Sequence, residues 1–278
     1  MEMIRNSGAI LLLLFATAVC AQQPLLQGVN HTPIVVSNLE KAEADFQAMG
    51  FTIKPGRIHP DGIRNAHVKF ANETELELIT ASKGVDDLSS EYLKKLESGE
   101  GPVYYGLFAP DLTKVLNKAH SAGLPLKSDD GLLTFPVGSP LHAIFFGMLG
   151  KVSTDRPEYF VHRNTATRLS GFWVKDSKEI RELFRAFNVP LVDSASCGAF
   201  PSRIAVARLP NGSVFLVPQS GSSEVLGARV DVRSISVAEA TLRNAGFKPQ
   251  KYLCSNNSVW LPPSVAHGIW LQFAQSPQ

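Results

Sequence analysis

The sequence predicts an α+β protein in which one β-α-β-β-β unit occurs four times. Three observations predict this architecture. An apolar pattern with helical spacing recurs at four places, a Gly or Asn follows each of these segments, and short β-rich segments come next. A single unit of this kind leaves one face of its sheet uncovered, so the four units are expected to pair.

Four amphipathic helices carry the repeat. Each has mostly apolar residues at spacings of three, four and three, and the four copies align without a gap. Gly50, Gly123, Asn188 and Gly246 follow the helices, where a left-handed residue commonly ends a helix. The predicted inner faces are Leu39, Ala42, Phe46 and Met49; Leu112, Val115, Ala119 and Ala122; Ser177, Ile180, Phe184 and Phe187; and Ile235, Ala238, Leu242 and Ala245.

The starts of the helices carry capping residues. Ser37 with Glu40 and Asp176 with Glu179 have the spacing of a capping box, and Ser234 is placed to cap the fourth helix. Strands are expected at 51–54, 66–70 and 75–80 in the first unit, and at 251–254, 258–261 and 268–273 in the fourth. Four unrelated helices in an α+β protein are the alternative, which the shared flanking segments disfavour.

Charge and composition exclude several classes of function. The 278 residues include 27 Lys and Arg against 25 Asp and Glu, so the net charge of +2 gives no bias toward nucleic acids, and no nucleic-acid partner is expected. The sequence contains no Walker loop, no His-Glu-x-x-His, no Cys-x-x-Cys and no Gly-x-Ser-x-Gly motif. Hydrophobic residues make up 44% of the chain, which is enough for one large or two small cores.

The amino terminus has the pattern of a signal peptide. Residues 9–21 form an apolar run too short to span a membrane, and small residues precede Gln22, so we expect cleavage after Ala21 and an exported protein, periplasmic or secreted, without a transmembrane span. Lipidation of Cys20 is a rival interpretation, which the bulky Val19 disfavours. Cys197 and Cys254 would remain, either as a disulfide or as two thiols.

The first unit carries a resemblance to a known family. Its stretch NHTPIVVSNLEKAEADFQAMGFTIKPGRIHPDGIRNAHVKFANETELELI has a His on the first strand, a Gly-Arg-x-His-Pro turn and a Leu-Glu-Leu fourth strand. This stretch resembles the glyoxalase-like branch of the vicinal oxygen chelate superfamily, which includes glyoxalase I, methylmalonyl-CoA epimerase, extradiol dioxygenases and bleomycin-resistance proteins. The resemblance implies two domains, 25–165 and 166–278, each made of two units in a strongly curved, half-open sheet.

The resemblance also implies a metal site in the first domain. Ligands in that superfamily come from the first and fourth strands of paired units, and these positions match His31, Glu77 and His162, with Tyr104 at the remaining position. Two imidazoles and a carboxylate suit Zn²⁺, Fe²⁺, Mn²⁺ or Ni²⁺. Glu75 shares a strand face with Glu77, so it is an alternative ligand or a catalytic base. A hydrogen-bonded, structural role for His31 is the competing interpretation.

The second domain is expected to lack a metal site, because Leu169, Leu216 and Gly227 occupy matching positions and cannot ligate through their side chains. A polar loop in the first unit is a candidate substrate-binding region or, alternatively, a solvated turn. The candidate substrate-binding residues are Arg57, His59, Arg64 and Asn65, together with Tyr104.

Two functions remain open from the sequence. The first is a metal-assisted enzyme of the lyase, isomerase or ring-cleaving dioxygenase type that acts on a small oxygenated substrate. The second is a metal-free protein of the bleomycin-resistance type that binds a small molecule. Four units in one chain supply both pairs internally, so the chain is expected to fold without a partner, as a monomer or as a homodimer.

Overall fold

The structure is a computed structural model, and it describes residues 23–196, 198–219, 223–252 and 255–276. The expected signal peptide at 1–21 and both Cys197 and Cys254 lie outside the described residues. No helix among the described residues has the length and apolar character needed to cross a membrane.

The first half of the chain forms two five-stranded sheets, one for each unit. The first unit supplies the order β3-β4-β5-β2-β6, and the second supplies β7-β10-β9-β8 with β1 at its edge. A helix not expected from the sequence, α2, lies between the two units. The elements are β1 Gly28–Val29, β2 His31–Val35, α1 Leu39–Ala48, β3 Lys54–Ile58, β4 Ile63–Lys69, β5 Glu75–Ala81, α2 Asp87–Glu97, β6 Gly101–Pro102, β7 Tyr105–Phe108, α3 Leu112–Ser121, β8 Lys127–Asp129, β9 Leu132–Thr134, β10 Ile144–Gly147 and the 3-10 helix η1 Pro157–Phe160.

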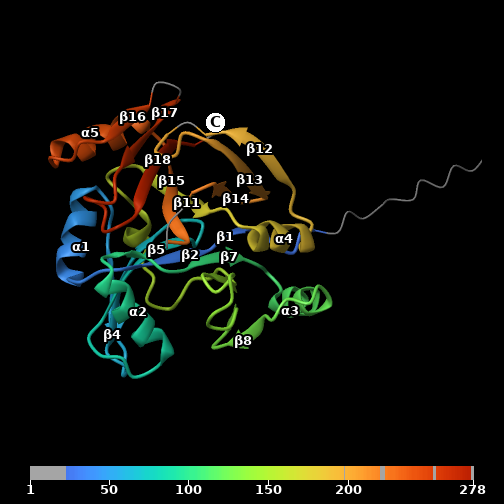
Figure 1. The fold of residues 1–278 in the computed structure, drawn as a ribbon. Helices are drawn as coiled ribbons and strands as arrows, with labels where there is room; N and C mark the ends of the chain where they lie inside the picture. The colour runs from blue at the N-terminus through green and yellow to red at the C-terminus, as the bar shows by residue number, and fades with distance from the viewer. Residues whose placement is uncertain (1–22, 197, 220–222, 253–254, 277–278) are drawn as a thin grey trace, which may run out of the picture.

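The second half forms one eight-stranded sheet in the order β12-β13-β14-β11-β15-β18-β17-β16. Each of its units again has a strand, a helix and three further strands, so the fourfold α+β repeat is confirmed. Figure 1 shows this sheet above the strands of the first half. The elements are β11 Ala166–Lys175, α4 Lys178–Ala186, β12 Leu191–Ala195, β13 Arg203–Leu209, β14 Gly212–Val217, β15 Val225–Val232, α5 Ile235–Asn244, β16 Gln250–Tyr252, β17 Ser255–Leu261 and β18 Trp270–Gln275.

The ends of the helices follow local backbone chemistry. Three helices are capped by a side chain that accepts a hydrogen bond from the first turn, namely Asn38, Ser177 and Ser234. The predicted caps Ser37 and Asp176 therefore lie one residue too early, whereas Ser234 is confirmed. Gly50 has φ +92° and Asn188 has φ +57°, which are the left-handed conformations expected after a helix.

The two units within each half meet along their first strands. In the second half β11 and β15 pair antiparallel from Ala166 to Val174, with irregularities, and make one continuous ladder. In the first half the corresponding seam is interrupted: β1 pairs with β7, and β2 pairs with β6, but the ladder breaks around Asn30 and Tyr104. The first half therefore has two sheets where the second has one.

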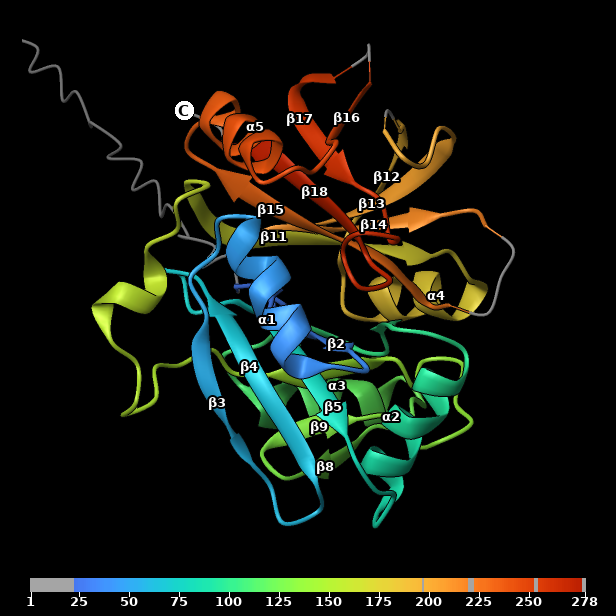
Figure 2. The same ribbon diagram turned by 90° about the vertical axis from the view of Figure 1, so that its left-hand side faces the viewer.

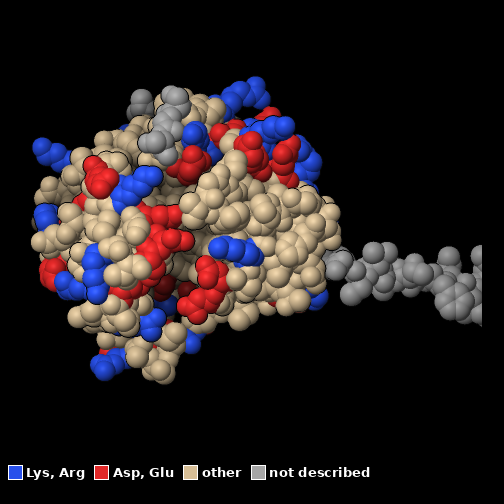
Figure 3. Space-filling model, turned by 60° about the horizontal axis from the view of Figure 1, so that its bottom comes forward, with Lys and Arg blue, Asp and Glu red and all other residues tan. Residues whose placement is uncertain are grey.

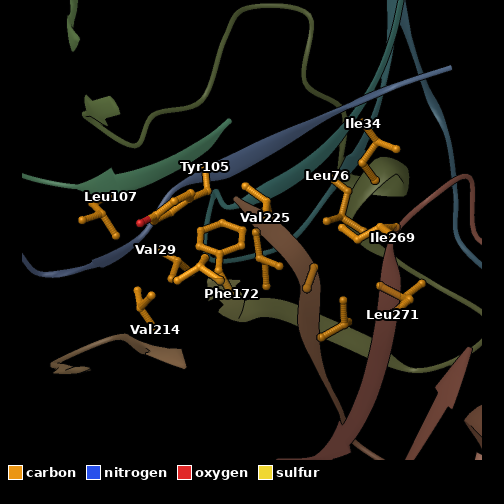
Figure 4. Close-up of a cluster of buried hydrophobic side chains, with 14 of the residues drawn as sticks. Val29, Ile34, Leu76, Tyr105, Leu107, Phe172, Val214, Val225, Ile269 and Leu271 are labelled. Atoms are coloured by element: carbon orange, nitrogen blue, oxygen red, sulfur yellow. The ribbon is translucent and has the colours of Figure 1, made fainter. Parts of the chain in front are cut away.

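The hydrophobic core lies between the two halves. Figure 2 shows α1 between the strands of the first sheet and those of the second half. Phe51 after α1 stacks on Phe273 of β18 at a ring distance of 5.7 Å, and Tyr105 of β7 lies 5.4 Å from Phe172 of β11. Figure 4 shows the second of these contacts among other buried side chains from both halves. One continuous cluster of buried residues thus joins the halves.

Separating the halves is therefore expected to expose apolar surface. A fragment of residues 22–164 would uncover side chains such as Phe51 and Tyr105, and we expect it to aggregate or self-associate, whereas the full mature chain should run as a monomer. Size-exclusion chromatography with light scattering checks both expectations. A soluble, monomeric 22–164 fragment with a cooperative unfolding transition would show that the halves fold independently.

Candidate functional site

Alternation along β4 and β5 gives the first sheet one apolar and one polar face. Ala66 and Val68 of β4 and Leu76 and Leu78 of β5 point to the core, so their neighbours along each strand point the other way. Adjacent strands add to the same face, because His31 pairs with Glu75 and Lys54 pairs with His67. We call this surface the polar face; its residues are His31, Lys54, Asn65, His67, Lys69, Glu75 and Glu77.

His31 and Glu77, both predicted as metal ligands, lie close together on this face. The Nε2 atom of His31 is 3.9 Å from Oε2 of Glu77, and the two side chains are 21% and 13% exposed. His31 Nδ1 donates to Asn30 Oδ1 at 2.8 Å, which leaves the Nε2 lone pair directed away from that bond. Asn65 Nδ2 donates to Glu77 Oε1 at 2.7 Å. Each residue therefore has one atom held in place and one atom facing the other.

Glu75 binds a cation on the same face. Its Oε2 atom lies 2.7 Å from Lys69 Nζ, and its Oε1 atom lies 3.5 Å from His67 Nδ1. Burial works in the opposite direction, but His67 and Lys69 beside it hold the pKa of the Glu75 carboxyl well below its usual range. A carboxylate in this state is a weak proton acceptor. This argues against the role of base and for a role in holding the neighbouring cations.

His67 has a buried nitrogen that meets Glu75 only at long range. Burial disfavours the charged imidazole, but Glu75 beside it and Glu77 across the strand more than offset this effect and raise the pKa of His67. Nδ1 is paired with Glu75 Oε1 at 3.5 Å, a long contact that leaves room for a second acceptor. Lys54, on the next strand, is bound to Asp155 with a distance of 2.5 Å between Nζ and Oδ1. Figure 3 shows acidic side chains gathered near the middle of one face, with Lys and Arg side chains around them.

The second unit and α2 add aromatic side chains beside the polar face. The ring of Phe145 on β10 lies 4.7 Å from that of His31. A Cβ at Gly106 would lie 2.4 Å from the Phe145 ring, so only glycine leaves the ring its space. Tyr104 lies 5.5 Å from His142, whose Nε2 atom is 2.9 Å from Glu91 Oε1 of α2.

His162 does not lie on the last strand of the second unit, the position from which it was predicted to be a metal ligand. The last strand of the second unit is β10, not the segment at 159–162, where η1 ends and a loop begins. His162 is buried against Phe51 and Phe70. Its Nδ1 atom accepts from the Thr52 amide at 3.0 Å, and its Nε2 atom donates to the Lys69 carbonyl at 2.9 Å. Both ring nitrogens are therefore used within the protein.

The candidate substrate-binding residues separate into two groups. Asn65 lies on the polar face, and Tyr104 lies at its edge in contact with Tyr92 of α2. Arg57 and His59 lie on the hairpin of β3 and β4, where Arg57 Nε is 3.2 Å from His59 Nε2. The side chain of Arg64 binds Glu40 of α1, on the opposite side of the sheet from the polar face. The structure therefore brings Asn65 and Tyr104 to the site but directs Arg64 away from it.

In the second half, aromatic residues cover the face that corresponds to the polar face. Trp173 stacks on Phe215 at 4.3 Å and lies 5.1 Å from Trp260, while its Nε1 atom donates to Gln272. Leu169 and Leu216 point into the core. Among the described residues, aromatic side chains occupy the face of the second half that corresponds to the polar face.

The resemblance implies a divalent metal, and the residues of the first half fit it only in part. His31 and Glu77 are oriented as ligands with supporting hydrogen bonds. However, the second unit places Phe145 on its last strand, facing His31, and His162 is used elsewhere. No three His, Cys, Asp or Glu residues within the described ranges are arranged to hold a metal ion. The described donor set therefore does not fit a metal held by both units.

Three residues of the polar face were not expected from the sequence: Lys54, His67 and Lys69. The signal was present in β4, where Asn65, His67 and Lys69 alternate with apolar residues at a period of two. The apolar positions of this strand predict its core side, and the polar positions between them predict the opposite face.

Comparisons with known proteins agree with this fold. The model of a family described as glyoxalase-like domain matches residues 29–181, more than half of the chain. No curated protein gives a significant match. Among solved structures, an extradiol ring-cleaving dioxygenase from B. fuscum matches with a TM-score of 0.64 and 12% identity, covering 93% of this chain and 74% of its own.

Two further structures have the same fold. A hypothetical protein from Staphylococcus aureus matches with a TM-score of 0.63 and 12% identity, covering 90% of this chain and 100% of its own. The Mn(II)-bound glyoxalase from Novosphingobium aromaticivorans matches with a TM-score of 0.57 and 13% identity, covering 91% of this chain and 83% of its own. At such identities the likeness shows the fold alone.

Proposed function

Because the chain belongs to the glyoxalase-like domain family, we propose that it binds a small oxygenated molecule at the polar face, beside Phe145 of the second unit. The observation that carries this proposal is the half-buried cluster of ionisable side chains on this face, in which His31 faces Glu77 while His67 and Lys69 face Glu75. Ionisable groups gathered in this way are typical of sites where ligands bind.

The polar face offers donors and acceptors side by side. Lys69 and His67 supply N–H groups on one side of Glu75, and His31 Nε2 and Glu77 Oε2 supply acceptors on the other. A molecule with adjacent carbonyl and hydroxyl oxygens matches this arrangement, because its carbonyl oxygen accepts and its hydroxyl donates. The apolar part of such a molecule would pack against Phe145.

Thermal unfolding in the presence of EDTA tests the proposal. We expect at least one of three ligand classes, 2-oxo acids, 2-hydroxy acids or catechols, to raise the Tm without added metal. His67→Ala should lose this stabilisation. His59→Ala is the matched control, because His59 lies on the hairpin, and it should keep the stabilisation. A Tm that rises only with divalent ions, and falls back with EDTA, would reject this proposal.

A metal-assisted lyase, isomerase or ring-cleaving dioxygenase is the second candidate. It is favoured by one observation, the orientation of His31 Nε2 toward Glu77 Oε2 with both outer atoms hydrogen-bonded. A structural neighbour is an Mn(II)-bound glyoxalase. Metal analysis of the purified chain after supplementation with Zn²⁺, Fe²⁺, Mn²⁺ and Ni²⁺ tests it. Stoichiometric metal that is lost in His31→Ala would support this candidate, and its absence would remove it.

We also propose that the chain is exported and cleaved after Ala21, as the amino-terminal pattern suggests. The support is the apolar run and the small residues before Gln22. Amino-terminal sequencing of the chain produced with its full leader should give Gln22 as the first residue. A mature chain that begins with a lipid-modified Cys20 would instead support the rival interpretation.

A further inference from the structure

We propose that the ammonium group of Lys69 serves in place of a metal ion at the polar face, and that it receives an oxyanion or carbonyl oxygen of the ligand. The inference rests on the proposed function, since it names the group that meets the ligand. It starts from the position of Lys69 in β4. Glu75 pairs with both His31 and Lys69, so these three side chains form one row across β2, β5 and β4.

The Lys69 ammonium is fixed rather than solvated. The side chain is 9% exposed, and its Nζ atom lies 2.7 Å from Glu75 Oε2. The backbone of the same residue is also held, because His162 donates to its carbonyl oxygen. A lysine fixed in this way directs a positive charge to one place, much as a bound cation does.

The same charge disfavours a divalent ion at this position. An ion near His31 and Glu77 would lie beside the Glu75 carboxylate, whose negative charge is already balanced by Lys69. The ammonium lies on the other side of that carboxylate, in the same half-buried row, so its charge opposes a divalent ion there. The second unit adds Phe145 instead of a further ligand. The proposal thus accounts for donors of the first unit that come together without a complete metal site.

The arrangement also indicates what binds. The ammonium has three donors, of which Glu75 takes one, and the adjacent His67 Nδ1 meets the same carboxyl only at 3.5 Å. A single ligand oxygen within reach of both groups would satisfy His67 and pair with Lys69 at once. A carbonyl or carboxylate oxygen has this geometry and charge.

Metal binding by Lys69 variants tests the inference with Mn²⁺ as the probe. Lys69→Met removes the charge and keeps most of the volume, so we expect it to bind one Mn²⁺ per chain at least tenfold more tightly than the wild-type chain does. The gain should disappear in Lys69→Met/His31→Ala. Lys69→Arg keeps the charge and should bind no better than wild type. Lys54→Met is the matched control, because Lys54 lies on the same face but pairs with Asp155, and it should show no gain.

Calorimetry and metal analysis of the folded, full-length mature chain give the answer. Should Lys69→Met not fold, Lys69→Gln makes the same test, since its amide can still donate to Glu75. Wild-type chain that already binds one Mn²⁺ as tightly as the variant, or an uncharged variant that gains nothing, would overturn the inference. If Lys69→Met gains Mn²⁺ binding but no ligand raises the Tm, the role of Lys69 as the cation is supported and the proposed function is rejected.

Discussion

Replacing His162 by glutamine is expected to remove a large part of the acid sensitivity of the fold. Burial lowers the pKa of His162 to about 4, although its hydrogen bond to the Lys69 carbonyl acts in the opposite direction. In the unfolded chain the pKa is near the ordinary value of 6.5. The unfolded state therefore binds a proton first as the pH falls. The contribution to stability is complete above pH 6.5 and is lost progressively down to about pH 4.

The size of the effect follows from the separation of the two pKa values. At pH 4.5 the wild-type chain should have lost about 2.5 kcal/mol of its free energy of unfolding through this group alone. Glutamine can accept from Thr52 and donate to Lys69, so His162→Gln should cost about 1 kcal/mol at neutral pH and lack this pH dependence.

Urea unfolding of both proteins at pH 7.5 and pH 4.5 measures the difference. Other groups titrate in both chains, so the comparison isolates His162. The same loss of stability in wild type and variant would show that His162 is not a buried neutral imidazole.

Gly268→Ala is expected to destabilise the contact between the two halves by about 3 kcal/mol or more. Gly268 lies in the loop between β17 and β18 and has φ +82°. A Cβ built there would lie 2.0 Å from the Glu100 carbonyl oxygen in the first half. The flexible end of a side chain could move aside, but here the obstacle is the backbone just before β6. The loop or the strand must therefore shift.

The shift would also disturb the polar contacts that join the halves at this point. His267, next to Gly268, lies with Nδ1 2.7 Å from Glu100 Oε2 and Nε2 3.0 Å from Asp45 Oδ2 of α1. These residues line a cavity of about 750 Å³ at the junction of the halves. A moved loop would lengthen both contacts.

Gly246→Ala is the matched control. Gly246 has φ +87°, but a Cβ there would meet no atom within 4 Å, so alanine should cost only the unfavourable backbone conformation, about 1 kcal/mol. Urea unfolding of both variants separates the steric contact from the backbone effect. Equal losses of stability at the two positions would contradict the tight approach of Gly268 to Glu100.

The parts of the fold that could be predicted from the sequence are those set by burial and local backbone chemistry. Helix α1 was predicted from the spacing of Leu39, Ala42 and Phe46, because a helix buries one stripe of side chains. The proximity of His31 and Glu77 was implied by the family resemblance, and the structure has it because β2 and β5 are neighbouring parallel strands.

The parts that could not be predicted depend on contacts between distant segments. The segment at 159–162 reads as a strand, but β10 already completes the second unit, and His162 fills a space beside Phe51 and Phe70. Helix α2 is an insertion that the repeat does not contain. The position of Phe145 against His31 depends on the register of β10 with β7, which no local pattern fixes.

The interrupted seam of the first half joins its two units through fewer regular strand pairs than the seam of the second half. The ladder between β11 and β15 makes the third and fourth units a single rigid sheet. In the first half the regular ladder stops beside His31 and Tyr104, where the side chain of Thr32 donates to the Tyr104 carbonyl oxygen instead. The same interruption leaves space for the ring of Phe145 to lie against His31. The duplicated halves have thus diverged in how their units are joined as well as in chemistry.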